Sequence, residues 1–204
     1  MAYEGGLLRR AENLAKSYFL TEIAFSKEDI FLDCGANVGD VKLWFNLKGI
    51  KIEYQAFEPS PVEFSCLKEN VSPSKTYNIG LWNKLGELKF YVSSEGADSS
   101  LIEPPTYDEI INVKVRRLED FVNTKVKCLK LEAEGAEPEI LEGLGDKIKL
   151  IEYIAADLGF ERGIKAESTF IPVNNILIKN DFELVKINHR SVRALYRNKS
   201  FQKI

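Results

Sequence analysis

Residue types that build metal sites and imidazole chemistry are scarce in this sequence. Its 204 residues include one histidine, His189, and three cysteines, Cys34, Cys66 and Cys128. None of the four stands at C-x-x-C or H-x-x-x-H spacing, so the sequence does not indicate a zinc site. A Ser-His-Asp or Cys-His mechanism would depend on His189 alone. We interpret His189 as an exposed residue of a hairpin turn, because it stands between two short predicted strands.

Long apolar runs and a signal peptide are also missing. No run approaches the roughly 18 apolar residues of a membrane span, and residues 1–5 do not begin a charged and then apolar leader. Cysteines without a secretion signal are typical of reduced thiols. The 28 Lys and Arg against 31 Asp and Glu give a net charge of −3, which argues against a nucleic-acid partner over the whole surface. We expect a cytoplasmic protein with no membrane partner.

The length of 204 residues fits one domain, with an N-terminal helical cap over 1–27 and a sheet with its helices over 28–204. Apolar residues at helical spacing predict that the cap contains an amphipathic helix, which covers a sheet face. Short apolar runs and helical patterns then alternate: we predict strands over 29–33, 51–57, 76–81, 86–92, 126–131 and 150–156, helices over 38–47, 61–70, 138–144 and 167–179, a long loop over 93–112, and a hairpin of 183–187 and 192–196. This order predicts an α/β fold, whose mostly parallel sheet is covered on both faces and gains an antiparallel strand from the hairpin.

A glycine-containing turn follows the first predicted strand, where residues 33–39 read Asp-Cys-Gly-Ala-Asn-Val-Gly. Ligands of doubly wound sheets bind at the carboxyl ends of strands, and glycines let the backbone turn sharply there. A dinucleotide motif would place glycines at 37 and 40, where this sequence has Asn37 and Asp40. Asp33 and Asp40 would repel a pyrophosphate and suit a cationic ligand without phosphate, such as S-adenosylmethionine. A plain tight turn, with Asp33 capping the next helix, is the alternative.

An acid also follows the second predicted strand. Glu58 stands nineteen residues beyond Gly39, and an acid in this position can accept two hydrogen bonds from a ribose diol. The two features together favour a ligand that contains adenosine. NAD stays open as an alternative ligand.

Five segments of the sequence resemble the FkbM family of S-adenosylmethionine-dependent methyltransferases, and they occur in the family's order: residues 29–39, 56–61, 78–83 with Gly86, 118–121 and 130–137. The last segment, Lys-Leu-Glu-Ala-Glu-Gly-Ala-Glu, is the most distinctive of the five. It is similar to the family motif Lys-x-Asp-x-Glu-Gly-x-Glu. The resemblance spans about residues 29–157.

The resemblance implies a three-layer, doubly wound, seven-stranded Rossmann-like methyltransferase sheet. It also implies methyl transfer from S-adenosylmethionine to oxygen, often on sugars or other natural-product hydroxyls, with S-adenosylhomocysteine as the product. The cofactor-binding residues that it implies are Asp33, Gly35, Ala36, Asn37, Gly39, Glu58, Pro59, Asn78, Gly80, Leu81, Ser99 and Ser100. Glu58 would hold the ribose, the residues of the first turn the methionine end, and the residues from Asn78 onward the adenine.

Methyl transfer to a hydroxyl needs a group that removes the proton as the acceptor is aligned. The candidates are Glu132, Glu134 and Asp157, which follow the predicted central strands. Glu132 is the first choice as base or substrate orienter, although the family usually has aspartate there and the extra methylene moves the carboxylate by about 1 Å. Glu134 could instead cap the following helix. Lys130 could pair with one of these acids and hold it ionised.

We expect the acceptor to be a small molecule or a glycan with a hydroxyl group, bound by the loop over 93–112 and the region over 159–169. Alternatives are an RNA methyltransferase and a non-catalytic S-adenosylmethionine-binding protein. We predict no metal ligands, while oxygen ligands at the strand ends leave a divalent cation open as an alternative. The basic segment after Glu183 is interpreted as a solvated strand edge, or else as a contact for an anionic substrate. A homo-oligomer also stays open.

Overall fold

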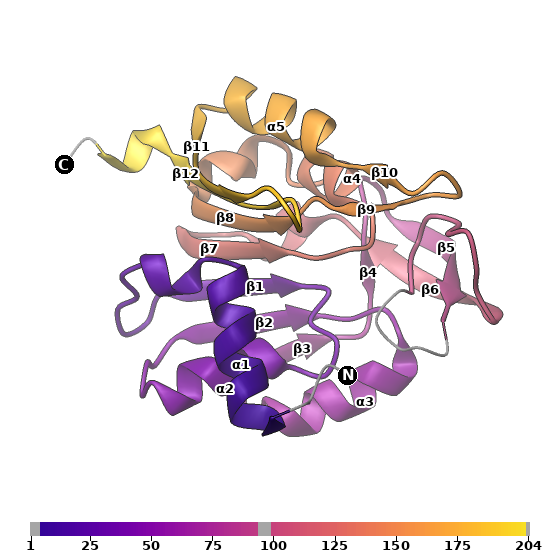
Figure 1. The fold of residues 1–204 in the computed structure, drawn as a ribbon, viewed down its shortest axis with the longest axis horizontal. Helices are drawn as coiled ribbons and strands as arrows, with labels where there is room; N and C mark the ends of the chain where they lie inside the picture. The colour runs from indigo at the N-terminus through magenta and orange to yellow at the C-terminus, as the bar shows by residue number, and fades with distance from the viewer. Residues whose placement is uncertain (1–4, 94–98, 203–204) are drawn as a thin grey trace.

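The computed structural model describes residues 5–93 and 99–202. Its main sheet has seven strands in the order β11-β12-β8-β7-β1-β2-β3 (Figure 1). The strands are β1 (Ile30–Cys34), β2 (Glu53–Phe57), β3 (Lys75–Tyr77), β7 (Val126–Leu131), β8 (Ile151–Asp157), β11 (Phe182–Asn188) and β12 (Arg193–Asn198). Neighbours from β3 through β8 pair in parallel, while β12 is antiparallel to both β8 and β11. The predicted α/β fold, with its mostly parallel sheet and antiparallel hairpin strand, is therefore confirmed.

Helices cover both faces of this sheet, as Figure 1 shows. On one face lie α1 (Gly6–Ser17), α2 (Asp40–Leu47) and α3 (Pro61–Asn70), and on the other lie α4 (Glu137–Glu142) and α5 (Phe170–Lys179). Short 3-10 helices span Leu20–Glu22, Leu118–Phe121, Gly145–Leu150 and Lys199–Gln202. Among the described residues, no helix has both the length and the apolar character needed to span a membrane.

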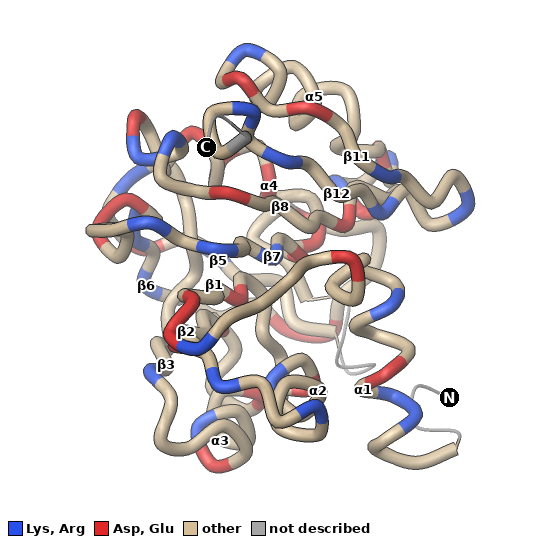
Figure 2. Tube along the Cα trace, turned by 90° about the vertical axis from the view of Figure 1, so that its left-hand side faces the viewer, with Lys and Arg blue, Asp and Glu red and all other residues tan. Residues whose placement is uncertain are grey.

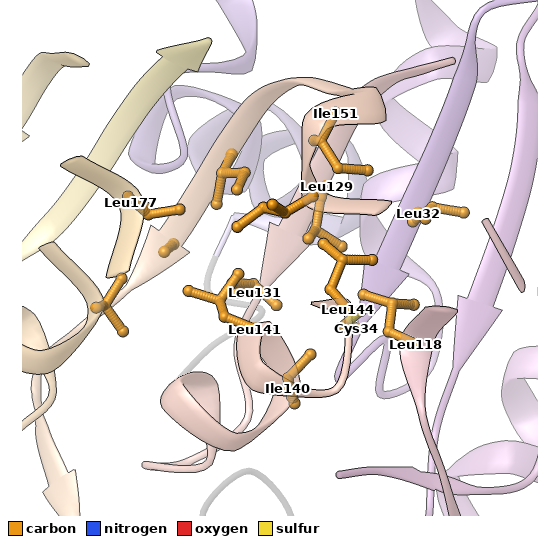
Figure 3. Close-up of a cluster of buried hydrophobic side chains, with 14 of the residues drawn as sticks. Leu32, Cys34, Leu118, Leu129, Leu131, Ile140, Leu141, Leu144, Ile151 and Leu177 are labelled. Carbon is orange, nitrogen blue, oxygen red and sulfur yellow. The ribbon is translucent and has the colours of Figure 1, made fainter. Parts of the chain in front are cut away.

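Alternate residues of the central strands enter two different cores. Leu32 and Leu129 pack with Ile140 and Leu177 of the helices on one face (Figure 3). Phe31 belongs to the opposite cluster, which includes buried residues of α1 and α2. Because both faces are covered, β1 reads as an almost continuous apolar run rather than as a strict alternation. The exception within that run is Asp33.

Residues 76–81 do not form one strand as the sequence predicts. The chain leaves the main sheet after β3, and β4 (Gly80–Leu81) pairs with β6 (Glu109–Arg116) in a separate three-stranded sheet of order β4-β6-β5. The strand β5 (Gly86–Val92) forms as predicted and pairs antiparallel with β6. The predicted loop therefore ends before residue 109, and the strand β6 is missing from the prediction. Its signal was the alternation of buried Val113 and Val115 with exposed neighbours, which begins only after a polar stretch.

The segment predicted as a helix over 167–179 begins differently. Its first two residues form β10 (Glu167–Ser168), which pairs with β9 (Phe160–Arg162) in a small hairpin, and α5 starts only at Phe170. The hydroxyl of Ser168 accepts the N–H of Phe170, which fixes the chain just before the helix. This hairpin projects from the end of β8 toward the three-stranded sheet (Figure 1).

Basic and acidic residues are interspersed along the chain (Figure 2). Within the basic C-terminal segment, Lys186 of the edge strand β11 pairs with Glu22 at 2.9 Å, and Lys199 pairs with Asp181 at 2.9 Å. His189 is exposed in the turn between β11 and β12, as predicted. The exposed Lys186 on β11 agrees with the interpretation of a charged, solvated sheet edge.

Candidate active site

A cavity of about 370 Å³ opens at the carboxyl ends of β1 and β2, beside β4 and the segment after β7. This is the edge where a doubly wound sheet places its ligands. The residues predicted from the sequence that line it are Gly35, Asn37, Glu58, Pro59, Gly80, Leu81, Ser99, Glu132 and Glu134. Apolar side chains complete the wall, among them Ile79, Phe90, Leu101 and Ile140. The cavity therefore combines a polar turn with an apolar surface.

The turn after β1 is held from two sides. Gly35 has a φ of +72°, and a Cβ there would lie 1.7 Å from the carbonyl oxygen of Glu132, so only glycine fits between β1 and the end of β7. The N–H of Glu132 in turn donates to the carbonyl of Cys34 at 3.1 Å. Asn37 also adopts a left-handed conformation, and its N–H donates to Glu58 Oε2 at 2.9 Å. The turn and the ends of β2 and β7 thus form one connected frame.

Glu58 is the most deeply buried acid on the cavity wall, with 6% of the residue exposed. Its Oε2 accepts the N–H of Asn37, and its Oε1 accepts the N–H of Ser60, both at 2.9 Å. Burial raises the pKa of Glu58 to about 7, and the two backbone N–H groups oppose that rise. A carboxylate oxygen has more than one lone pair, so the group can accept further hydrogen bonds from a ligand hydroxyl in the cavity.

Asp33 is predicted as a cofactor-binding residue, but its side chain does not line the cavity. It is fully buried and accepts hydrogen bonds from the Tyr54 hydroxyl and from Lys130 Nζ, the latter at 2.8 Å. Burial raises the pKa of Asp33, whereas Lys130 lowers it. The alternative in which Asp33 caps the next helix is wrong, because α2 starts after Gly39 with no side-chain cap. Asp33 instead stabilises the turn through Lys130, whose ammonium also donates to the carbonyl of Gly35.

Four more predicted cofactor residues lie outside the cavity wall and support it: Ala36, Gly39, Asn78 and Ser100. Gly39 has a φ of +91°, and a Cβ there would meet Val71 of the α3 end at 2.5 Å. The Asn78 amide donates to the carbonyls of Glu58 and Pro59. The Ser100 hydroxyl donates to the carbonyl of Glu134 at 2.8 Å. Asn78 and Ser100 thus fix the backbone of three lining residues.

Lys130 is the centre of a buried charge network. It is 1% exposed, and its Nζ lies 2.8 Å from Asp33 Oδ1, 2.9 Å from Glu132 Oε2 and 2.9 Å from the carbonyl of Gly35. Burial disfavours the ammonium group, but the two carboxylates outweigh burial and hold the pKa of Lys130 above its usual value. The expected pairing of Lys130 with one of the candidate catalytic acids is confirmed for Glu132, and Lys130 also pairs with Asp33.

Glu132 is ionised at neutral pH. Burial would raise its pKa, but Lys130, with smaller contributions from Tyr18 and Arg193, outweighs burial, so that the pKa of Glu132 lies below its usual value. Arg193 Nη2 lies 3.8 Å from Glu132 Oε1. A carboxylate held in this way is a weak proton acceptor, because its protonated form is disfavoured. The neighbouring cations therefore favour the ionised form of Glu132.

Asp157, at the end of β8, is buried and does not line the 370 Å³ cavity. Its Oδ2 lies 2.5 Å from Arg193 Nε, and its Oδ1 accepts the N–H of Gly159 at 3.2 Å. Burial raises the pKa of Asp157, while Arg193 lowers it. The Arg193 guanidinium on β12 therefore contacts both Asp157 and Glu132, and it ties the last strand of the sheet to the site.

Glu134 does not cap the following helix, so that alternative is wrong. The N-cap residue of α4 is Ala136. Glu137 instead accepts the N–H groups of Ala133 and Gly135 through Oε1, and the Thr169 hydroxyl through Oε2. Glu134, with a φ of +49°, lines the cavity instead. The carboxylate that organises this turn is one that the sequence reasoning missed.

A second cavity, of about 530 Å³, lies next to the first, and Glu134 lines both. Its wall includes Pro104, Pro105, Tyr107 and Asp108 from one segment and Phe160 and Glu161 from the β9–β10 hairpin. These segments fall within the two regions, 93–112 and 159–169, that the sequence predicts for the acceptor pocket. Glu161 itself was not predicted. Its signal was a carboxylate shortly after the carboxyl end of a central strand.

Within the described part of the chain, no group of three or more His, Cys, Asp or Glu residues could hold a metal ion. The acids at the strand ends are instead engaged by cations and by backbone N–H groups. Cys34 and Cys128 are buried thiols and Cys66 is exposed. Burial raises the pKa of Cys34 well above its usual value, so this thiol stays neutral next to the cavity.

Comparison with known proteins agrees with this arrangement. Residues 33–188, well over half of the chain, match the family model described as "Methyltransferase FkbM domain". The chain is 27% identical to Methyltransferase 1 of Beauveria bassiana over 169 residues, which cover 68% of each protein. It is 25% identical over 184 residues to the 31-O-demethyl-FK506 methyltransferase FkbM of Streptomyces tacrolimicus, covering 71% of this chain and 70% of that protein.

The fold also has a counterpart among solved structures. The crystal structure of the methyltransferase FkbM from Methylobacillus flagellatus KT aligns with a TM-score of 0.59 and 17% identity. The alignment covers 86% of this chain and 44% of that one, so the present chain corresponds to less than half of that protein. The match of the family model extends from the last two residues of β1 to the end of β11 and includes every acid of the site described above. The chain therefore belongs to the FkbM methyltransferase domain family.

Proposed function

We propose that the protein transfers a methyl group from S-adenosylmethionine to the oxygen of a small hydroxyl-bearing acceptor, such as a sugar or another natural product. The observation that carries the proposal is the position of Glu58. Its carboxylate lies on the wall of the 370 Å³ cavity, and the N–H groups of two different loops fix its two oxygens. This arrangement suits a group that accepts hydrogen bonds from the two hydroxyls of a ribose.

The rest of the cavity fits the donor molecule. Ile79, Leu81 and Leu101 offer an apolar surface that suits the adenine ring, and the turn from Gly35 to Asn37 suits the methionine end. When bound, S-adenosylmethionine supplies a methyl group already activated by its sulfonium. Among the predicted cofactor residues, Asp33, Ala36, Gly39, Asn78 and Ser100 would act by positioning those that line the cavity.

We place the acceptor in the 530 Å³ cavity, because Glu134 lines this cavity as well as the donor cavity. Two prolines and the rings of Tyr107 and Phe160 give it flat apolar surfaces, on which a sugar or polyketide ring can lie. Its charged lining residues, Asp108, Glu134 and Glu161, are all acidic. These acids disfavour a phosphorylated acceptor or RNA. The name of the Streptomyces relative describes methylation of an oxygen, which agrees with a hydroxyl acceptor.

Titration calorimetry with S-adenosylmethionine and S-adenosylhomocysteine tests the donor half of the proposal. We expect both to bind, and Glu58→Gln to weaken S-adenosylhomocysteine at least tenfold, because a charged acceptor of hydrogen bonds is lost. Glu69→Gln, an exposed acid of α3, is the matched control and should leave the affinity unchanged. Absence of binding of either molecule to the wild-type protein would overturn the proposal.

The acceptor half is tested by transfer of a radiolabelled methyl group to a panel of free monosaccharides, polyols, nucleotide sugars and short RNAs. We expect label in neutral hydroxyl compounds, and mass spectrometry should locate the new methyl group on oxygen. Label confined to nucleotide sugars or RNA would contradict the assignment of the acidic cavity. Binding of the donor with no transfer to any compound of the panel would favour the non-catalytic alternative.

A further inference from the structure

We propose that Glu161 is the group that removes the proton from the acceptor hydroxyl during methyl transfer, an inference that rests on the proposed function. Glu161 belongs to β9, in the hairpin that follows the carboxyl end of β8. Its side chain lines the 530 Å³ cavity together with Glu134, the residue shared with the donor cavity. A carboxylate on this wall faces the space in which the acceptor would lie.

Three other acids near the site already have partners. Glu132 pairs with Lys130, and Asp157 pairs with Arg193. Glu137 accepts two backbone N–H groups and one hydroxyl. Within the described residues, by contrast, the side-chain carboxylate of Glu161 forms no hydrogen bond and no ion pair. A base must have a free lone pair that can reach the substrate, and Glu161 meets that requirement where Glu132 and Asp157 do not.

The charges around Glu161 adapt it to accept a proton. Asp157 at the end of β8, Glu137 of α4 and Glu132 after β7 act on it as negative charges, and Arg193 of β12 is the opposing cation. Burial, followed by these three acids, raises the pKa of Glu161 to about 8. A carboxylate with a pKa in this range is a stronger base than an ordinary glutamate and is still ionised in an appreciable fraction of molecules near neutral pH.

The reaction balances with this assignment. The acceptor oxygen forms a bond to the methyl carbon while the bond between that carbon and sulfur breaks. The electron pair of the broken bond stays on sulfur. The hydroxyl proton passes to Glu161, which starts as a carboxylate and ends as a neutral acid. No oxidant, reductant or metal enters the balance. Solvent then takes the proton from Glu161 before the next turnover.

The first experiment measures the pKa of Glu161. A carbon-13 NMR titration of the glutamate carboxyl groups in the full chain should show one group that titrates near pH 8, and Glu161→Gln should remove that signal alone. Glu167→Gln, an exposed acid in the same hairpin, is the control and should leave the signal in place. If the signal assigned to Glu161 titrates at the ordinary value near 4, the inference is overturned.

The second experiment uses the free monosaccharide with the highest turnover in the panel. Glu161→Gln should lower kcat by about 10²–10⁴-fold, with little change in KM and with unchanged affinity for S-adenosylhomocysteine. Glu161→Asp should restore part of the rate, and Glu167→Gln should match the wild type. A Glu161→Gln kcat within twofold of the wild type would overturn the inference while leaving the proposed function intact. Failure of the proposed function shows separately, as absence of cofactor binding by the wild-type protein.

Discussion

The ammonium of Lys130 lies 2.8 Å from the carboxylate of Asp33, and both groups are buried between β7 and β1. The two residues stand 97 positions apart in the sequence and meet on adjacent parallel strands. Since Lys130 also contacts Glu132 and the Gly35 carbonyl, this one cation joins the turn after β1 to the motif after β7. The pair therefore stabilises the two segments that carry Gly35 and Glu132 on the cavity wall.

Replacement of Lys130 should therefore destabilise the protein strongly. Lys130→Met leaves Asp33 buried without its cation, and removal of one partner of a buried pair costs about 3–5 kcal/mol. Lys149→Met removes an exposed pair with Asp146 and should cost about 1 kcal/mol or less. Urea denaturation measures both free energies of unfolding. Equal losses in the two variants would contradict the structural role of Lys130.

The close approach at Gly35 predicts a second difference between matched variants. Gly35→Ala combines a left-handed φ with a Cβ 1.7 Å from the Glu132 carbonyl, whereas Gly49→Ala has a similar φ of +66° and nothing within 4 Å. The control should lose about 1–2 kcal/mol from the backbone conformation alone. Gly35→Ala should lose clearly more, and should also weaken S-adenosylhomocysteine binding. Thermal unfolding compares the stabilities of the two variants, and calorimetry compares their affinities. Similar losses of stability would show that the backbone at residue 35 shifts to accommodate the Cβ without a further energetic cost.

The raised pKa of Glu58 predicts how stability changes with pH. With a folded pKa of about 7 against an ordinary value of 4.5, the folded protein binds more protons than the unfolded chain between these two values. The contribution of Glu58 to the free energy of unfolding must therefore fall as pH rises from about 4.5 to 7. Glu58→Gln should flatten that decline in a series of urea titrations. A slope unchanged in the variant would mean that Glu58 titrates normally.

The same group predicts a pH dependence of cofactor affinity. Only the ionised form of Glu58 can accept charge-assisted hydrogen bonds from both ribose hydroxyls. S-adenosylhomocysteine should therefore bind more tightly as pH rises through about 7. We expect a gain on the order of tenfold. Calorimetry in buffers of different ionisation enthalpy measures the affinity and the proton released together. Affinity that is flat from pH 6 to 8 would contradict the role of Glu58.

The basic C-terminal segment provides a third pair of matched variants. Arg193→Met removes the cation beside Asp157 and Glu132 and should destabilise the fold by about 3 kcal/mol. Arg190→Met, in the exposed turn of the same hairpin, should change neither stability nor methyl transfer by a measurable amount. Loss of transfer in Arg190→Met, with stability unchanged, would instead indicate that this edge contacts an anionic substrate.

Much of the frame could be read from the sequence because strand ends and turns follow local chemistry. The apolar run before Asp33 and the glycines at 35 and 39 indicate a strand and its turn, and the spacing to Glu58 indicates a second strand end at the same edge. In the structure these segments meet as expected, and Glu58 lines the cavity. Such features depend on a few residues that are close in the sequence, so they can be predicted from a single sequence.

The remaining features depend on contacts between distant segments. That Asp33 is buried, rather than exposed in the cavity, follows from Lys130 and Tyr54, which reach it from other strands. The local pattern around Glu134 also suggested a helix cap, whereas Glu137 holds that turn with Thr169, 32 positions later. Glu161 owes its environment to acids of three other elements. None of these relationships leaves a periodic trace in the sequence.

The contact of Arg193 with Asp157 and Glu132 has a consequence for synthesis and for truncation. The chain must be synthesised through β12 before Arg193, the cation that pairs with the buried Asp157, is present. Nascent chains and fragments that stop before residue 193 hold the buried Asp157 without its cation, whereas Glu132 keeps its pair with Lys130. The carboxyl end of β8 should therefore reach its full stability only when β12, the last strand in the chain, is paired with it.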